Sequence, residues 1–139
     1  MAGGRVPTES TMKTVPMDRE PGTPADRILD ILQELEAASS SSVVVVIIDT
    51  FLDSVPKQMA AIRRAVETND IGAVKTGAHT LRGGSGTLGA MRLAALCSGL
   101  EEYCERGSLV GAATLLVTME AEFDRVSEVL HEARAGVSA

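Results

Sequence analysis

Apolar residues recur at spacings of three and four along most of this chain, which is the pattern of helices that bury one face. One stripe is especially long and is formed by Val44, Ile48, Phe51, Val55, Met59, Ile62 and Val66. It begins inside a run of β-branched residues, Val43 to Ile48, which on propensity alone would favour a buried strand. Because a strand does not sustain this repeat for so long, the pattern predicts one long helix, which Pro56 should bend.

Two segments before and after this helix carry the same repeat. A shorter helix is predicted to begin with Thr23 as N-cap and Pro24 as first residue, to bury Ile28, Ile31, Leu32 and Leu35, and to end in the serines at 39–42. The turn Asn69-Asp70 should end the long helix and cap the next one. That next helix has a stripe made of Ile71, Val74, Ala78, Leu81, Ser85 and Leu88.

The C-terminal third predicts two more helices. One follows Gly89, ends at Gly107 and has a stripe made of Leu93, Cys97, Leu100 and Cys104. The other takes Ser108 as its N-cap, with a stripe made of Leu109, Ala112, Leu116, Met119, Phe123, Val126 and Leu130. Four long amphipathic helices with short connections predict an all-α, antiparallel four-helix bundle, and the short N-terminal helix should pack against one end.

Composition agrees with one domain at residues 23–136 after a disordered tail at 1–22, because four of the five prolines lie within the first 24 residues, which show no apolar repeat. The chain has 139 residues, of which 45% are hydrophobic but only 2% aromatic, so the core must be largely aliphatic. A net charge of −6 argues against a nucleic-acid partner. Cys97 and Cys104 are too far apart along one helix for a disulfide, and no paired histidines accompany them as ligands of a zinc site.

The most informative polar residue is His79, which points roughly 135° away from the centre of its helix's apolar stripe. The positions around it on that surface are small or cationic: Gly72, Lys75, Thr76, Arg82, Gly83 and Gly86. Lys75 and Arg82 lie about one helical turn from His79, where they could neutralise phosphoryl oxygens. Each glycine inside a helix lowers helix stability by roughly 1 kcal/mol relative to alanine. So many glycines in one helix therefore indicate that a partner must approach its backbone closely. An ordinary surface histidine beside a glycine-rich segment is the plain alternative.

This segment resembles the histidine phosphotransfer (HPt) domain of bacterial phosphorelays, whose motif is approximately His-Thr-Leu-Lys-Gly, three small residues, one variable position and Leu-Gly. The residues that match in register are His79, Leu81, Gly83, Leu88 and Gly89. The likeness extends over about residues 25–135 through Phe51, Pro56, the Asn69-Asp70 turn, Leu93, Leu96, Leu100 and Glu101. Arg82 stands where the family usually has lysine, and the run at 83–87 also resembles the phosphoaccepting domain of chemotaxis kinases.

The resemblance implies a phosphoryl carrier rather than an enzyme with its own turnover, and no Gly-Lys-Ser/Thr motif for ATP is present. His79 would accept a phosphoryl group from a receiver-domain aspartate or a hybrid sensor histidine kinase and pass it to another receiver. Lys75 and Arg82 would steady that group, while Gly72, Thr76, Gly83 and Gly86 would meet the partner. No cofactor or metal is expected on this chain, because the receiver would bring the Mg²⁺. We expect a cytoplasmic monomer without a membrane segment.

Two other functions stay open on the residues alone. A bundle of the same fold could bind a receiver or kinase as an adaptor without being phosphorylated. Alternatively, His79 could act as a general base on a small substrate, which would require a deep pocket beside it. Other polar features are less informative: Glu101, Glu102 and Glu105 are predicted to form a solvated face, Ser85 lies on the buried stripe and His131 off its helix's stripe. The sequence Gly84-x-Gly86-x-x-Gly89 lacks the preceding strand of a dinucleotide site.

Overall fold

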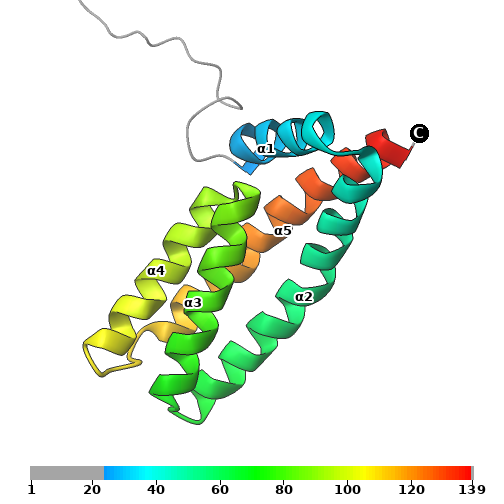
Figure 1. The fold of residues 1–139 in the computed structure, drawn as a ribbon. Helices are drawn as coiled ribbons and strands as arrows, with labels where there is room; N and C mark the ends of the chain where they lie inside the picture. Colours follow the sequence, from blue (N-terminus) through cyan, green and yellow to red (C-terminus); the bar gives the residue numbers. More distant parts are fainter. Residues whose placement is uncertain (1–23, 139) are drawn as a thin grey trace, which may run out of the picture.

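A computed structural model describes residues 24–138, which form five helices and no strand. They are α1 (Pro24–Ala38), α2 (Ser41–Glu67), α3 (Ile71–Leu88), α4 (Met91–Glu105) and α5 (Ala112–Ser138), as drawn in Figure 1. The predicted tail at residues 1–22 and the predicted N-cap Thr23 lie outside the described residues.

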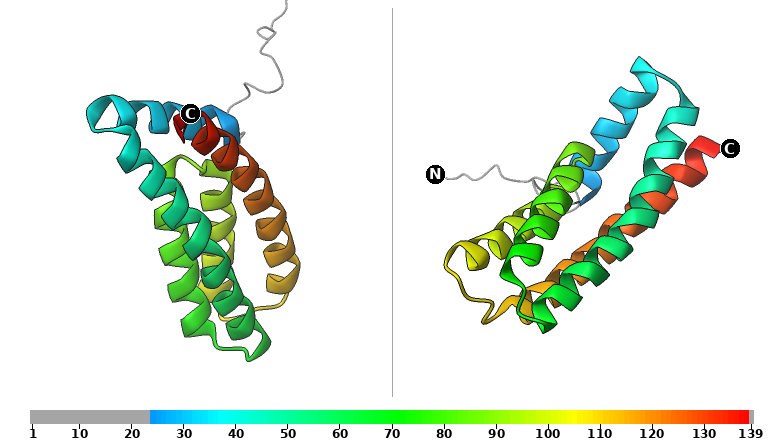
Figure 2. Two further views of the ribbon diagram at one scale, coloured as in Figure 1. Left: turned by 90° about the vertical axis from the view of Figure 1, so that its right-hand side faces the viewer. Right: turned by 60° about the horizontal axis from the view of Figure 1, so that its bottom comes forward.

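Helices α2 to α5 form an antiparallel four-helix bundle, in which consecutive helices run in opposite directions (Figure 1). The α3–α4 hairpin is shorter than α2 and α5, which have 27 residues each. The far ends of α2 and α5 therefore project beyond the hairpin, and α1 lies across them at one end of the bundle (Figure 2). The fold predicted from the apolar repeat is confirmed, including the position of the N-terminal helix.

The run of β-branched residues belongs to a helix, as its periodicity predicts. The side chain of Ser40 caps α2 by accepting the N–H of Val43 at 3.3 Å. One face of α2 is then buried along its length, through Val44, Ile48, Phe51, Val55, Met59, Ile62 and Ala65. Burial of this stripe outweighs the weak helix propensity of valine and isoleucine. Pro56 lies inside α2, and its bend stays a prediction.

Helix α3 begins after the Asn69-Asp70 turn and ends at Gly89, as the sequence predicts. Asp70 accepts the N–H of Ala73 at 3.1 Å and so caps the first turn. Gly89 ends the helix in the left-handed conformation, with φ 93°. A side chain at Gly89 would also collide with α1, because an added Cβ would lie 2.8 Å from the carbonyl oxygen of Arg27. Gly89 therefore both reverses the chain and admits α1 against the hairpin.

The predicted start of the last helix is wrong. Helix α5 begins at Ala112, so Ser108 is not its N-cap and Leu109 lies in the preceding turn. The Ser108 hydroxyl accepts the N–H of Val110 instead, and the Gly111 carbonyl accepts the N–H of Leu115. Gly111 has φ 92°, a left-handed conformation that interrupts the helical path between Ser108 and Ala112.

The core is largely aliphatic, as the composition predicts. Phe51 is its buried aromatic side chain, and Tyr103 and Phe123 are partly buried against it, with the ring centroids of Phe51 and Phe123 6.1 Å apart. Cys97 and Cys104 are buried free thiols. Burial raises the pKa of Cys97 to about 12. Within residues 24–138, no helix combines the length and the apolar character needed to cross a bilayer.

Candidate functional site

His79 lies on the exposed face of α3, near the middle of the helix. Its side chain is 68% exposed, whereas Ala78 and Leu81 beside it face the core and are almost completely buried. The direction expected from the helical wheel is therefore the one observed. A ring placed in this way is open to a macromolecule approaching from solvent.

A carboxylate from the neighbouring helix meets the imidazole. Oε2 of Glu101, on α4, lies 3.2 Å from Nδ1 of His79. The Glu101 side chain is only 13% exposed, so it is largely shielded from solvent where it meets α3. The prediction that Glu101 forms part of a solvated face is wrong, although Glu102 and Glu105 are exposed as expected. Glu101 is the functional candidate that the sequence reasoning did not assign to the site.

Arg82 completes a cluster of three side chains. Its Nη2 lies 3.1 Å from Nδ1 of His79, and its Nε lies 2.6 Å from Oε1 of Glu101. The Nε atom is buried and has no hydrogen-bond partner among the residues that the structure describes, so its close approach to Glu101 is an ion pair without a directed N–H bond. Arg82 therefore faces the histidine and the carboxylate together, rather than extending alone into solvent.

The other predicted contact residues lie towards the N-terminal half of α3. Gly72, Lys75 and Thr76 are all exposed. The ammonium of Lys75 acts on Cys104 of α4: burial raises the pKa of that thiol, and the positive charge partly offsets the shift. Lys75 thus lies on the α4 side of α3, the side on which Glu101 meets His79.

The glycines of α3 divide into two groups. Gly77 is required by the bundle, because an added Cβ would lie 2.7 Å from Cγ1 of Ile62 on α2. At Gly83, Gly84 and Gly86, by contrast, an added Cβ would have no neighbour within 4 Å. No contact within residues 24–138 explains these three glycines, and they leave a bare strip of helix beginning one turn beyond His79.

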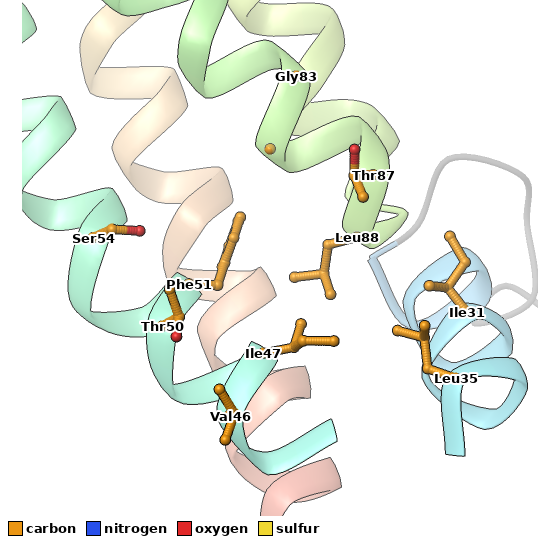
Figure 3. Close-up of a pocket in the computed structure, with 11 residues that line it drawn as sticks. Ile31, Leu35, Val46, Ile47, Thr50, Phe51, Ser54, Gly83, Thr87 and Leu88 are labelled. Carbon is orange, nitrogen blue, oxygen red and sulfur yellow. The ribbon is translucent and has the colours of Figure 1, made fainter. Parts of the chain in front are cut away.

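Hollows lie on both sides of this strip. The first, of about 520 Å³, lies between α1, α2 and α3 and has apolar walls that include Ile31, Leu35, Val46, Ile47, Phe51 and Leu88. Figure 3 shows Ile47 and Leu88 on one side of this space, with Ile31 and Leu35 of α1 facing them. The second, of about 580 Å³, lies between α3 and α4 and is lined by Arg82, Gly83, Gly86, Thr87, Met91, Ala94, Ala95 and Ser98. Gly83 and Thr87 border both hollows.

This arrangement suits transfer at a surface better than catalysis in a pocket. The exposed imidazole lines neither hollow, so neither of them supplies the deep pocket that the general-base alternative requires. Ser85 is completely buried, which removes it as a nucleophile. Among the described residues, no group of three or more histidine, cysteine or acidic side chains is placed to hold a metal ion. What the site offers is one nucleophilic ring, a carboxylate and an arginine.

Comparisons with known proteins agree with this geometry. The Hpt domain model matches residues 46–129. Histidine-containing phosphotransfer protein 2 of Arabidopsis thaliana is 26% identical over 104 residues, which are 73% of this chain and 67% of that protein. The crystal structure of histidine-containing phosphotransfer protein B from Pseudomonas aeruginosa superposes with a TM-score of 0.72 and 31% identity, covering 76% of this chain and 91% of that one. The five-helix chain with its exposed His79 therefore belongs to the Hpt domain family of histidine phosphotransfer proteins.

Proposed function

We propose that His79 is the phosphoacceptor of this chain, and that it takes a phosphoryl group from the aspartate of a receiver domain and returns it to another. The observation that carries this proposal is the exposed imidazole with its Nδ1 atom against the carboxylate of Glu101. That contact leaves Nε2 as the ring nitrogen available to the partner.

The transfer balances with residues of this chain and one partner aspartate. The lone pair of Nε2 forms the N–P bond as the bond between phosphorus and the aspartyl oxygen breaks, and that oxygen leaves with the electron pair. The ring gains positive charge and keeps its proton on Nδ1, and this N–H donates a hydrogen bond to the Glu101 carboxylate. Glu101 thus stabilises the charge that develops in the transition state.

The two cations act on the phosphoryl oxygens. Arg82 is half-exposed beside the ring, and its guanidinium can reach from the imidazole to a group bound at Nε2. Lys75 lies about one turn before His79 and adds positive charge to the same face of α3. The Mg²⁺ of the reaction belongs to the receiver, and this chain contributes positioning and charge without an ATP site of its own.

The partner docks over the bare strip formed by Gly83, Gly84 and Gly86. Without side chains there, a partner's backbone can approach α3 closely. The apolar hollow between α1, α2 and α3 receives apolar side chains of the partner, while Gly72 and Thr76 border the docking face on the other side of His79. The partners are receiver domains of response regulators and of hybrid sensor kinases, met by a monomer in a reducing, cytoplasmic setting.

A transfer assay tests the proposal directly. Receiver domains phosphorylated on their aspartate with acetyl phosphate are mixed with this chain and with His79→Gln. The wild type should acquire phosphate that is labile in acid and stable in alkali, and His79→Gln should acquire none. His131→Gln is the matched control, because the second histidine is also exposed but lies on α5, and it should be labelled like the wild type. Equal receiver binding by both proteins without any label would establish an adaptor and contradict phosphotransfer.

A further inference from the structure

The Nδ1 atom of His79 has two neighbours with opposite requirements. Glu101 Oε2, at 3.2 Å, is a carboxylate oxygen and can only accept a hydrogen bond. Arg82 Nη2, at 3.1 Å, belongs to a guanidinium and can only donate one. Nδ1 can therefore bond to Glu101 when it carries a hydrogen, and to Arg82 when it carries a lone pair.

In the neutral ring these two bonds exclude each other. Neutral imidazole has one N–H, so a hydrogen on Nδ1 leaves the lone pair on Nε2, and a lone pair on Nδ1 places the hydrogen on Nε2. The first tautomer is nucleophilic at Nε2, the nitrogen that faces the partner in the proposed function. The second tautomer has no lone pair there and cannot attack phosphorus.

We infer that Arg82 is a positioning residue that withholds the nucleophilic tautomer of His79 until a phosphoryl group draws its guanidinium away. This inference rests on the proposed function of His79 as phosphoacceptor. While Arg82 donates to Nδ1, it stabilises the tautomer with hydrogen on Nε2. Glu101 stabilises the other tautomer, so the ring is divided between the two.

The contacts of Arg82 allow it to move. Its side chain is 41% exposed, and its buried Nε–H has no acceptor despite the short distance to Glu101. An unsatisfied buried donor favours any rearrangement that gives it a partner. Phosphoryl oxygens carry negative charge and are stronger acceptors for a guanidinium than a neutral ring nitrogen. When Arg82 turns to them, Nδ1 is left with Glu101 alone.

The protons balance with solvent water as the only exchange partner. The ring releases the hydrogen on Nε2 to water and takes one from water on Nδ1, so the net charge of the ring is unchanged. The Nε2 lone pair then forms the N–P bond, and the bond from phosphorus to the donor oxygen breaks. A lysine at position 82, the usual residue of the family, would present a single ammonium instead of a planar fork that bonds the ring and contacts the carboxylate at once.

Nitrogen-15 NMR of the His79 ring measures the tautomers without any phosphate. Spectra are recorded at a pH above which the ring shifts no longer change. Arg82→Met, which keeps an unbranched stem but no donor, should shift the tautomer ratio towards hydrogen on Nδ1 by about tenfold, as expected for loss of one charge-assisted hydrogen bond. Glu101→Ala should shift the ratio in the opposite direction. Lys75→Gln removes a nearby charge that makes no hydrogen bond to the ring and should leave the ratio unchanged.

An unchanged ratio in Arg82→Met, or the same shift in Lys75→Gln, would overturn the inference. Circular dichroism of each variant establishes that the helices are intact, so an altered ratio cannot be attributed to unfolding. Treating the same proteins with phosphoramidate, a small phosphoryl donor, tests the proposed function separately. If no variant is labelled while the tautomer ratio moves as expected, then Arg82 controls the tautomer and the phosphoacceptor role is wrong.

Discussion

Glu101 holds the imidazole of His79 from the neighbouring helix, with Oε2 3.2 Å from Nδ1. The two residues lie at the same height on the antiparallel α3–α4 hairpin. Nine positions separate His79 from the end of α3 at Leu88, and ten separate Glu101 from the start of α4 at Met91. The hairpin turn at Gly89 therefore fixes the pair, and a deletion or insertion in that turn would separate them.

Removing this carboxylate should slow phosphotransfer. Glu101→Ala leaves Nδ1–H without its charged acceptor, so we expect the single-turnover rate with phosphoramidate to fall about tenfold, which corresponds to about 1.4 kcal/mol of transition-state stabilisation. Glu101→Gln keeps an oxygen acceptor without the charge, and its rate should lie between those of Glu101→Ala and the wild type. If Glu101→Ala reacts as fast as the wild type, Glu101 plays no part in the transfer.

Substitution by alanine should have opposite effects on stability at the two kinds of glycine in α3. In Gly77→Ala the new methyl would lie 2.7 Å from Cγ1 of Ile62, so this variant should be destabilised by about 1 kcal/mol or more. Gly83→Ala meets no atom within 4 Å and should instead gain about 0.5–1 kcal/mol from improved helix propensity. Urea denaturation measures both changes.

The Gly83→Ala variant also distinguishes an effect on folding from an effect on docking. Although more stable, Gly83→Ala should accept phosphate more slowly from a receiver domain, because its methyl stands where the partner approaches. Its rate with phosphoramidate, which is too small to need that space, should not change. A normal rate from the receiver would show that the bare strip is not the docking face.

A charge in the apolar hollow should weaken docking. Val46 borders this hollow and is 61% exposed, so Val46→Asp should leave folding intact but place an uncompensated carboxylate against the partner. We expect at least about tenfold weaker binding of a receiver domain by calorimetry. Val117 is 59% exposed on α5, so Val117→Asp is the matched control and should bind normally. Similar losses in the two variants would exclude the hollow as a specific docking surface.

The buried thiol of Cys97 predicts a loss of stability in alkali. Its pKa is raised by burial from 9.0 to about 12, with Glu101 adding to the shift. Above about pH 9 the unfolded chain releases this proton while the native chain retains it, so the free energy of unfolding should fall by about 1.4 kcal/mol per pH unit until about pH 12. Urea denaturation should show a shallower decline for Cys97→Ala. Equal slopes for the two proteins would mean that Cys97 ionises with an ordinary pKa in the native state.

Ser85 offers a test of polar burial. It is completely buried, and no residue in the described part of the chain hydrogen-bonds to its hydroxyl. Ser85→Ala removes this unsatisfied group and improves helix propensity, so we expect about 1 kcal/mol more stability and a Tm about 4 °C higher. A lower Tm in calorimetry would reveal that the hydroxyl is satisfied, for example by water.

The helices were predictable because each buries a continuous stripe over several turns, which local propensity does not override in the β-branched run of α2. The start of α5 was not, because the left-handed backbone at Gly111 breaks a stripe whose apolar spacing continues through it. His79 was recognisable from its position opposite a stripe on the same helix. That Glu101 meets His79 could not be predicted from either helix alone, because it depends on the register between α3 and α4, which neither apolar pattern contains. The hairpin turn at Gly89 could have supplied that register.

The three open glycines of α3 also bear on partner choice. Where a helix presents mostly main chain, every partner meets the same amides and carbonyls, so in the proposed docking mode the glycines themselves do not distinguish one receiver from another. Discrimination must then come from the walls on either side, such as Ile47 and Leu35 in the apolar hollow and Met91 beyond the other edge. A phosphotransfer protein built in this way can keep one common docking surface for the chemistry and change which partners it binds by replacing a few flanking side chains.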